Sequence, residues 1–367
     1  MAFPEVYPLH GGQLRQIAER FGIERSRLLD FSANINPSGP PASVLSRLHE
    51  SLEDPATLVE YPDLQQHDLK RALARHVGTC EENLIVGNGF VPLLEATLRI
   101  LKLRSCLLAL PAFVEYRKAL ERAGVEVVPY NFDSNSNFNY SPDFVLAGRA
   151  EAVLIANPQN PSGICQDRAL MRDLVAKASE DKRCVLLDEA FIDYMPENSL
   201  TTMVDQFANL IIFRSLTKFH AIPGLRVAYA VTNSTFAAAI EETLPPWPIT
   251  TLASLAAIAA LDDQAYAARS LLENSARREI LQRDLELAGL TVYMSAANFI
   301  LFRLPQEIDP DAFWQRMIVG HGIVLRACAN YEGLPSRHFR AAIRTEMDNK
   351  RLSTAITTTM SELQSIS

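Results

Sequence analysis

Residues 209–226 read NLIIFRSLTKFHAIPGLR, an apolar run followed at once by hydroxyl side chains, a lysine and an arginine. The apolar half predicts a buried strand, and a lysine at the end of a strand is usually a solvated charge. Here Ser215 and Thr217 flank Lys218, which puts two hydroxyl groups beside an amine. Arg226 follows a Pro-Gly turn, so hydroxyl and guanidinium donors can converge on one phosphate. Lysine forms imines with carbonyl compounds, and this stretch therefore favours a phosphate-bearing ligand next to an amine nucleophile.

A second polar group stands at the end of an apolar run further upstream. The run Cys184–Leu187 predicts another buried strand, and Asp188 follows it directly. An acid in this position often serves only as a helix N-cap. Ligands of open α/β sheets nevertheless gather at the carboxyl ends of strands, and a buried Asp188 paired with a pyridine nitrogen would keep that nitrogen protonated. This strand end therefore favours a ligand whose ring withdraws electrons.

Two further turns lie next to predicted elements, one after a strand and one before a helix. Residues 157–163 read NPQNPSG, and the amide of Asn157 is expected at the same level as Asp188. By composition alone this segment is a loop. Residues 87–91 read GNGFV and lead into a helical pattern, so their backbone amides can form a nest for an anion at a helix N-terminus. A GxG turn by itself is weak evidence for an anion site. Its support comes from the other polar motifs, which also stand at a strand end or a helix start.

The order of apolar runs indicates the fold class. Short apolar runs alternate with amphipathic segments between residues 87 and 231, which predicts a mostly parallel α/β sheet with helices on both faces. Beyond residue 248 the pattern changes to helices at 250–261 and 272–288 and strands near 299–302 and 339–344, a second and smaller α+β unit. The first residues are too few for a core of their own and are expected to fold onto this unit. The predicted strands of the larger unit cover residues 106–110, 125–130, 152–156, 184–187, 210–213 and 226–231. The predicted domains are a large one, residues 45–255, and a small one, residues 1–44 with 256–367.

Composition excludes several classes of function. The 367 residues are 48% hydrophobic and carry a formal net charge of -8 without a long basic run, which argues against nucleic-acid or membrane partners. No apolar run is long enough to span a bilayer and the N-terminus lacks a signal-peptide pattern, so a cytoplasmic protein is expected. The five cysteines are scattered without metal-ligand spacing, and we expect reduced thiols and no metal.

Taken together, the motifs resemble those of fold-type I enzymes that depend on pyridoxal 5′-phosphate (PLP). The resemblance covers nearly the whole chain and rests on NPQNPSG, LLDEAF and SLTKF with the following PGLR. It points to the branch that contains histidinol-phosphate aminotransferases and threonine-phosphate decarboxylases. The resemblance implies an aspartate-aminotransferase-like fold and PLP as the cofactor.

The resemblance also implies roles for individual residues. Lys218 would form the Schiff base with PLP and could later protonate the substrate at Cα, while Asp188 would pair with the ring nitrogen. Asn157 would donate to the ring hydroxyl and Phe113 would stack on the ring. Tyr61 would reach the phosphate in the partner subunit, which implies a homodimer with shared active sites. The phosphate would be held by the Gly89 turn, the amides of Phe90 and Val91, the hydroxyls of Ser215 and Thr217, and Arg226.

Some positions separate the two reactions. Histidinol-phosphate aminotransferases usually carry tyrosine where this chain has Phe113, and DEAY where it has DEAF, ending in Phe191. These phenylalanines and the segments 9–12, 31–37 and 339–346 are similar to threonine-phosphate decarboxylases. The resemblance thus implies decarboxylation of L-threonine O-3-phosphate to (R)-1-amino-2-propanol O-phosphate for cobalamin biosynthesis. The alternative is an aminotransferase of the histidinol-phosphate type. A non-catalytic PLP-binding protein, as in some transcription regulators, would need a DNA-binding segment for which we expect no room ahead of the fold.

Candidates for binding the substrate come from both ends of the chain. Arg326 and Arg340 stand at predicted strand ends of the smaller unit, and His10 and Asn34 lie in the N-terminal segment; Asn157 is a further candidate. An arginine in such a place can instead form a surface ion pair, and a lone histidine can be a structural hydrogen-bonding group. Guanidinium groups bind carboxylate or phosphate through paired contacts. Because the bond at Cα that is perpendicular to the ring breaks, these contacts would select the reaction.

Overall fold

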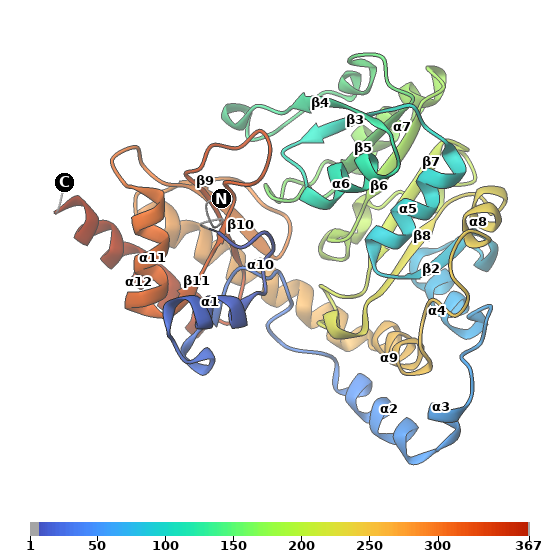
Figure 1. Ribbon diagram of the computed structural model, residues 1–367, viewed down its shortest axis with the longest axis horizontal. Helices are drawn as coiled ribbons and strands as arrows, with labels where there is room; N and C mark the ends of the chain where they lie inside the picture. The colour runs from blue at the N-terminus through green and yellow to red at the C-terminus, as the bar shows by residue number, and fades with distance from the viewer. Residues whose placement is uncertain (1–6, 366–367) are drawn as a thin grey trace.

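The computed structural model describes residues 7–365, and the larger of its two lobes is built on a seven-stranded sheet (Figure 1). The strand order is β2-β8-β7-β6-β5-β3-β4. Only β8 runs antiparallel to its neighbours, so the prediction of a mostly parallel sheet is confirmed. The strands are β2 (Leu84–Asn88), β3 (Ser105–Leu110), β4 (Glu126–Asn131), β5 (Ala152–Ala156), β6 (Cys184–Asp188), β7 (Leu210–Ser215) and β8 (Val227–Val231).

All six predicted strands of this sheet are present, with ends displaced by two residues at most. Strand β2 was not predicted. It has five residues and ends in Gly87-Asn88, residue types that are depleted in strands, so its apolar half is too short to give a signal. Its pairing with β8 over all five residues supplies the stability that local propensity lacks.

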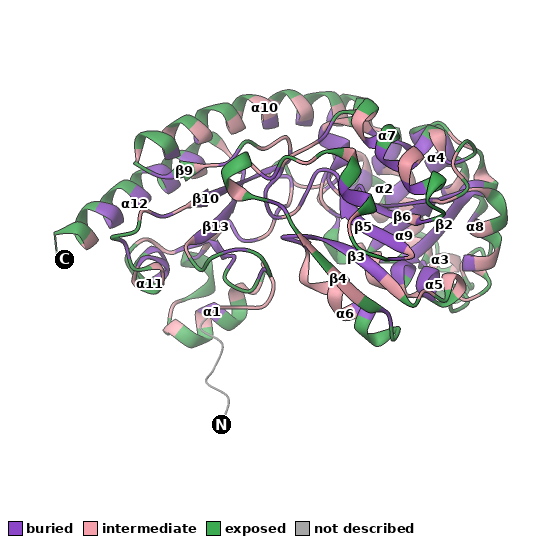
Figure 2. Cartoon of the chain, turned by 90° about the horizontal axis from the view of Figure 1, so that it is seen from above, coloured by how far each residue is buried: buried purple, intermediate pink, exposed green. Residues whose placement is uncertain are grey.

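Helices cover both faces of the large sheet. Successive strand residues point to opposite faces, so Ile85 packs in the cluster with α5, α6 and α8, while Val86 packs with α4, α7 and α9. Figure 2 shows the strands as the most deeply buried layer of this lobe. The helices are α4 (His67–Val77), α5 (Phe90–Leu101), α6 (Val114–Arg122), α7 (Arg168–Glu180), α8 (Ser234–Glu241) and α9 (Thr251–Asp262).

The smaller lobe packs an antiparallel four-stranded sheet, β12-β13-β10-β9, against helices α1, α10, α11 and α12. The long helix α10 (Gln264–Leu287) extends along the molecule from one lobe to the other (Figure 2). It begins at Gln264 instead of residue 272, because Asp263 accepts a hydrogen bond from the amide of Tyr266 and caps it. The remaining elements are α1 (Leu14–Phe21), α11 (Pro310–His321), α12 (Glu346–Gln364), β9 (Thr291–Val292), β10 (Phe299–Arg303), β12 (Arg326–Ala327) and β13 (His338–Ala342).

The N-terminal segment joins the two lobes. Strand β1 (Leu29–Asp30) pairs in parallel with β11 (Ile323–Val324) of the smaller lobe. A few residues later the backbone amide of Asn36 donates to the carbonyl of Lys218, at 3.1 Å. The segment that follows β1 therefore runs past the carboxyl ends of the large sheet.

The buried face of α9, as far as Leu261, belongs to the core of the larger lobe. It packs on α2 (Ala42–Glu53) and α4. The predicted boundary at residue 255 falls inside this helix. We therefore propose that the larger domain includes all of α9. Within residues 7–365, no helix combines the length and the apolar character needed to cross a bilayer.

Candidate active site

The predicted cofactor residues follow different strands of the large sheet and meet at one edge. Asp188 ends β6, Asn157 follows β5, and Lys218 lies just beyond β7. Gly89 follows β2, which runs in the same direction as β7 because both are antiparallel to β8. Arg226 immediately precedes β8, whose start lies at that same edge. The topology thus gathers an amine, a carboxylate, an amide and a guanidinium at the carboxyl edge of the sheet.

Lys218 is held among hydroxyl groups. Its Nζ donates to Oγ1 of Thr217 at 2.9 Å, and that hydroxyl lies 2.7 Å from Oγ of Ser215. Burial, with the nearby guanidinium groups of Arg226 and Arg340, lowers the pKa of Lys218 to about 8, although the charge of Asp188 opposes the shift. A substantial fraction of the amine is therefore neutral near pH 8, the form that attacks a carbonyl carbon.

Asp188 is buried, and burial raises the pKa of its carboxyl group. Three groups oppose that effect: hydrogen bonds from the hydroxyl of Tyr116 and the backbone amide of Ala190, and the charge of Lys218. A buried carboxylate with only neutral donors is costly, and a cationic ring nitrogen would compensate its charge.

The sequence prediction missed Tyr116. Its ring packs against Phe113 and Phe90, with centroids 5.7 Å and 5.4 Å away, while its hydroxyl reaches Asp188. The available signal was its position three residues after Phe113 at the start of a helix, which puts both side chains on one face.

The turn after β2 forms a cradle for a small anion. Gly89 has φ +91°, and a β-carbon there would lie 2.7 Å from Nη2 of Arg226. The amides of Phe90 and Val91 open α5 and have no acceptor inside the helix. Pro92 takes the next position without an amide, where a proline costs no helical hydrogen bond. The cradle is therefore positively polarised and fits a phosphate group.

Asn157 and Phe113 are the remaining predicted cofactor residues. Asn157 is buried, donates to the backbone carbonyl of Gln166 at 3.1 Å and accepts from its amide at 2.8 Å, which fixes the side chain. Phe113 precedes α6, and its ring centroid lies 6.1 Å from that of His10.

Two arginines of the smaller lobe face each other. Arg326 on β12 and Arg340 on β13 are directly opposite in the antiparallel pair, and both are buried. Arg326 donates to the carbonyls of Pro8 and Leu9, at 3.1 Å and 2.7 Å, and Arg340 to the carbonyl of Ser32 at 3.1 Å and to Asn160. Within residues 7–365 neither guanidinium forms an ion pair with a carboxylate.

The N-terminal candidates lie beside this pair. The Nε2 atom of His10 is 3.2 Å from Glu115, and burial lowers the pKa of the imidazole despite that carboxylate. Asn34 is buried, and its Oδ1 has no hydrogen-bond partner among the described residues. Because a buried amide oxygen without a partner is unfavourable, Asn34 is suited to receive a donor from a ligand.

Tyr61 is not brought into this site. Its side chain is 79% exposed and stacks on Trp247, with ring centroids 4.5 Å apart. Its predicted role in a partner subunit stays a prediction. Another residue, Tyr331, was not predicted at all, although it contacts both Arg326 and Arg340. It lies in a loop after β12, where no periodic pattern could have identified it.

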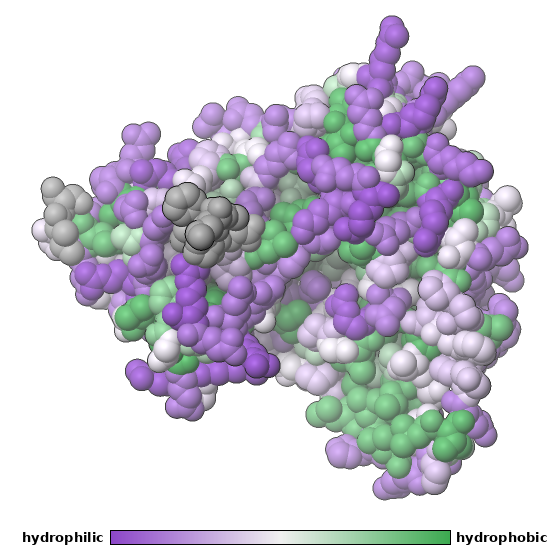
Figure 3. All heavy atoms as spheres, in the orientation of Figure 1, coloured by the Kyte–Doolittle hydropathy of each residue, from purple (hydrophilic) through white to green (hydrophobic). Residues whose placement is uncertain are grey.

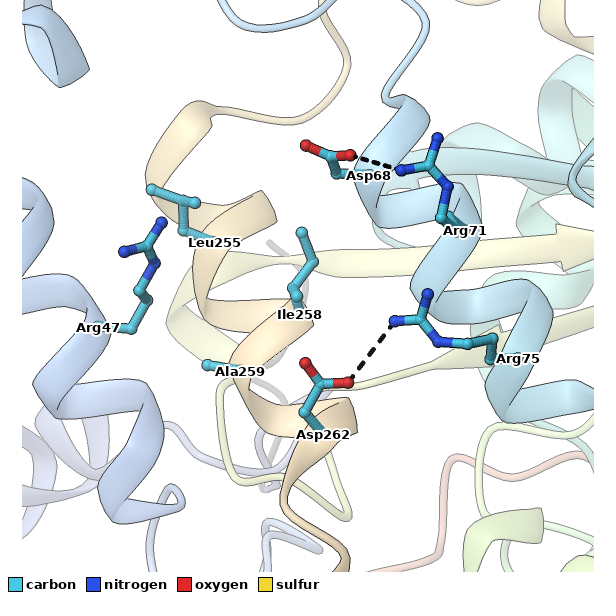
Figure 4. A pocket seen from close by; sticks show the side chains of 8 residues that line it. All are labelled: Arg47, Asp68, Arg71, Arg75, Leu255, Ile258, Ala259 and Asp262. Carbon is cyan, nitrogen blue, oxygen red and sulfur yellow. Dashed lines mark hydrogen bonds and ion pairs between the residues drawn. The ribbon is translucent and has the colours of Figure 1, made fainter.

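A separate hollow lies between α2, α4 and α9 (Figure 4). Its charged side chains are all paired, Arg71 with Asp68 at 3.1 Å, Arg75 with Asp262 at 3.7 Å, and Arg47 with Glu50 outside the hollow at 3.6 Å. None of the predicted cofactor or substrate residues lines it. The chemistry described above therefore belongs to the sheet edge and not to this hollow.

Comparison with known proteins agrees with this geometry. The model of the family "Aminotransferase class I and II" matches residues 26–357. The chain is 35% identical over 354 residues to the threonine-phosphate decarboxylase of Salmonella typhimurium, covering 95% of each chain. The histidinol-phosphate aminotransferase structure from Clostridium acetobutylicum is 30% identical, with a TM-score of 0.85 over 91% of this chain and 100% of that one. The Sinorhizobium meliloti enzyme in complex with PLP shares the fold at 24% identity, with a TM-score of 0.82 over 100% and 99%.

Fold and site thus define a PLP enzyme of fold type I. The chain belongs to the aminotransferase class I and II family. The residues at the sheet edge fit the cofactor of that family. The hydrogen-bond donors to the buried Asp188 in the described part of the chain are neutral, so a protonated ring nitrogen suits it, and the cradle at Gly89 suits a phosphate. Lys218 has the buried amine, with a lowered pKa, that an aldehyde cofactor would need at this edge.

Proposed function

We propose that this chain is a carboxy-lyase that decarboxylates L-threonine O-3-phosphate to (R)-1-amino-2-propanol O-phosphate in cobalamin biosynthesis. The observation that carries this proposal is the buried pair Arg326 and Arg340, which has no carboxylate partner in the described part of the chain. Two uncompensated buried cations are unfavourable until anions bind. A substrate with a phosphate and a carboxylate on neighbouring carbon atoms supplies both.

The relatives support this choice of reaction. Identity to the Salmonella decarboxylase is 35%, against 30% for the Clostridium aminotransferase. Phe113 and Phe191 also lack the hydroxyl groups typical of the aminotransferase branch. Phe191 packs edge-on against Phe299, with centroids 5.0 Å apart, and the guanidinium of Arg340 lies 5.1 Å from the same Phe299 ring. The aromatic pair Phe191 and Phe299 therefore forms an apolar surface next to Arg340.

Each residue then has a defined task. Bound PLP supplies a ring that accepts the electron pair released when a bond at Cα breaks. Asp188 keeps the proton on the ring nitrogen, and Asn157 donates to the ring hydroxyl. Arg326 and Arg340 hold the two anionic groups, and their hold on the carboxylate selects the bond that breaks. Lys218 would carry the proton that replaces the lost carboxylate at Cα.

The proposed assembly is a cytoplasmic homodimer. Apolar side chains gather on one exposed surface over α2 and α3 (Ala56–Val59) and beside it, which Figure 3 shows as a green region. Such an area exceeds the scattered apolar residues of an ordinary monomer surface. A second copy of the chain would cover it and bring Tyr61 to the partner's phosphate site. The surface comprises Leu45, Leu52, Leu58, Val59, Tyr61, Leu64 and Trp247.

One observation favours an alternative, an aminotransferase of the histidinol-phosphate type. The Clostridium histidinol-phosphate aminotransferase overlays this chain with a TM-score of 0.85 at 30% identity. An arginine pair can also bind the two carboxylates of a dicarboxylic amino donor. The reaction must therefore be tested directly.

The decisive experiment incubates the holoenzyme with O-phospho-L-threonine. Release of carbon dioxide without any added 2-oxoacid supports the decarboxylase. Turnover that requires 2-oxoglutarate, with an amino group left on the cofactor, supports the aminotransferase and rejects the decarboxylase. Arg340→Gln removes one proposed anion contact and should reduce turnover of phosphothreonine in either case.

A further inference from the structure

We infer that Tyr331 is a positioning residue that sets the separation of the two anion sites, and so selects substrates by the spacing of phosphate and carboxylate. This inference rests on the proposed function, because it takes Arg326 and Arg340 as the anion-binding groups. Tyr331 lies in the loop of residues 328–337, between β12 and β13, and its side chain is buried.

The arginine pair poses a physical problem. Residues directly opposite in an antiparallel pair have side chains on the same face and only about 5 Å between their β-carbons. Like charges in this arrangement repel, and burial strengthens the repulsion because water no longer screens it. Long guanidinium side chains without a carboxylate partner would turn away from each other unless other groups fix them.

Tyr331 is the group that contacts both guanidiniums. The Cζ atom of Arg326 lies 5.1 Å from the centroid of the Tyr331 ring, within the range of a cation–π interaction. Nη1 of Arg340 donates to the hydroxyl of Tyr331 at 3.3 Å, and that hydroxyl donates to Oδ1 of Asn160, also at 3.3 Å. One guanidinium rests on the face of a rigid ring and the other is bound to its far end, so the ring fixes the distance between them.

The loop that carries Tyr331 is itself fixed to the larger lobe. Arg117 on α6 holds Glu332 through two hydrogen bonds of 2.7 Å and 2.8 Å. The next residue, Gly333, has φ +85°, and a β-carbon there would lie 2.8 Å from Oδ1 of Asn131 at the end of β4. The loop is therefore anchored to the larger lobe directly after Tyr331, and this anchor does not involve the two arginines.

A fixed distance between two anion sites discriminates by substrate length. A carboxylate and a phosphate ester on neighbouring carbon atoms can engage both guanidiniums, whereas one additional methylene forces one contact to lengthen. A mismatched anion leaves one buried cation without a partner. We expect Tyr331 to impose this selectivity and not merely to strengthen binding.

The test uses amine-free probes, so that binding to the holoenzyme is measured without any reaction. The probes are 3-phosphoglycerate, whose two anionic groups stand on neighbouring carbons, and 4-phosphoerythronate, which is one carbon longer. Calorimetric titration should give wild-type binding about tenfold tighter for the shorter probe. Tyr331→Phe, which loses only the hydroxyl, should reduce this ratio to about threefold, and Tyr331→Leu should abolish it.

A matched control separates positioning from general stability. Tyr293 is another buried tyrosine, whose hydroxyl is 3.0 Å from Nε2 of His338 and which contacts neither substrate arginine. Tyr293→Phe should leave the ratio unchanged. The inference is wrong if Tyr331→Leu keeps the wild-type ratio, or if Tyr293→Phe lowers it as much as Tyr331→Phe does. If Tyr331→Leu does not fold, the probe ratio of Tyr331→Phe alone tests the inference, and an unchanged ratio in that variant contradicts it.

Kinetics with O-phospho-L-threonine provides the second measurement. Tyr331→Phe should raise KM about fivefold and change kcat less than about twofold, since the lost contact acts on binding. Absence of carbon dioxide release by the wild-type enzyme would reject the proposed function. The ratio for the two probes would still be measurable in that case, so the two failures are distinguishable.

Discussion

Gly89 lies directly against Arg226: a β-carbon at residue 89 would stand 2.7 Å from Nη2 of the guanidinium. This close approach, together with φ +91° at Gly89, explains why glycine ends the turn after β2. The guanidinium therefore stands immediately beside the first amides of α5. The two residues form one anion cradle, although they lie far apart in the sequence.

Gly89→Ala should consequently weaken cofactor binding. The new methyl group would push Arg226 out of the cradle, and we expect the Kd of the apoenzyme for PLP to rise at least about tenfold. Titration of apoenzyme with PLP, followed by absorbance, measures the change. Gly289→Ala is the control, because Gly289 has φ +84° but nothing in the described residues within 4 Å of a β-carbon. It should cost about 1 kcal/mol of stability and leave the Kd unchanged.

The depressed pKa of Lys218 predicts the pH dependence of cofactor attachment. Only the neutral amine attacks the aldehyde, so the rate of PLP binding to apoenzyme should rise with pH and reach half its maximum near the pKa of about 8. Because the charge of Arg340 lowers this pKa, Arg340→Gln should move the midpoint to higher pH. Stopped-flow absorbance follows the reaction. A wild-type midpoint near that of a free lysine, above pH 10, would contradict the burial of the amine.

Removal of the charge at residue 188 should reduce turnover with little effect on the fold. In Asp188→Asn no anion stabilises the protonated ring nitrogen, and we expect kcat to fall about 100-fold or more. Tyr116→Phe should have a smaller effect of the same kind. The hydroxyl of Tyr116 lowers the pKa of Asp188, so its loss raises that pKa and should shift the acid limb of the pH–rate profile to higher pH. An unchanged acid limb would show that this hydrogen bond does not govern the ionisation of Asp188.

The sequence predicted those features that depend on local composition. Apolar runs such as 152–156 identify strands, and the polar residue that follows each run, as with Asp188, lies at the carboxyl edge because the topology is parallel. Strand β2 escaped prediction because its stability comes from pairing with β8 and not from its own residues. Site residues on helices and loops also escaped prediction, because their place in the site depends on contacts with distant parts of the chain.

Tyr116 and Tyr331 illustrate this limit. Each acts through a hydrogen bond to a residue distant in the sequence, Tyr116 to Asp188 and Tyr331 to Asn160. No spacing rule connects such pairs, since their contact arises only when the lobes and the sheet have assembled. The arginines 326 and 340 could be proposed from the sequence, but their direct opposition across β12 and β13 could not.

Tyr61 permits a test of the dimer that does not depend on a structure of the assembly. If Tyr61 serves the partner's site, Tyr61→Ala damages the neighbouring site and Lys218→Ala damages its own. Co-expression of the two variants with different tags then yields hybrid dimers in which one site carries both defects and the other carries neither. Such hybrids should show about half of the wild-type activity, although each parent homodimer has little. As control, a hybrid of Lys218→Ala with Asp188→Asn should remain inactive, because both of those residues serve the site of their own chain. Inactivity of the Tyr61 hybrid would mean that Tyr61, 79% exposed in one chain, acts elsewhere than in a shared site.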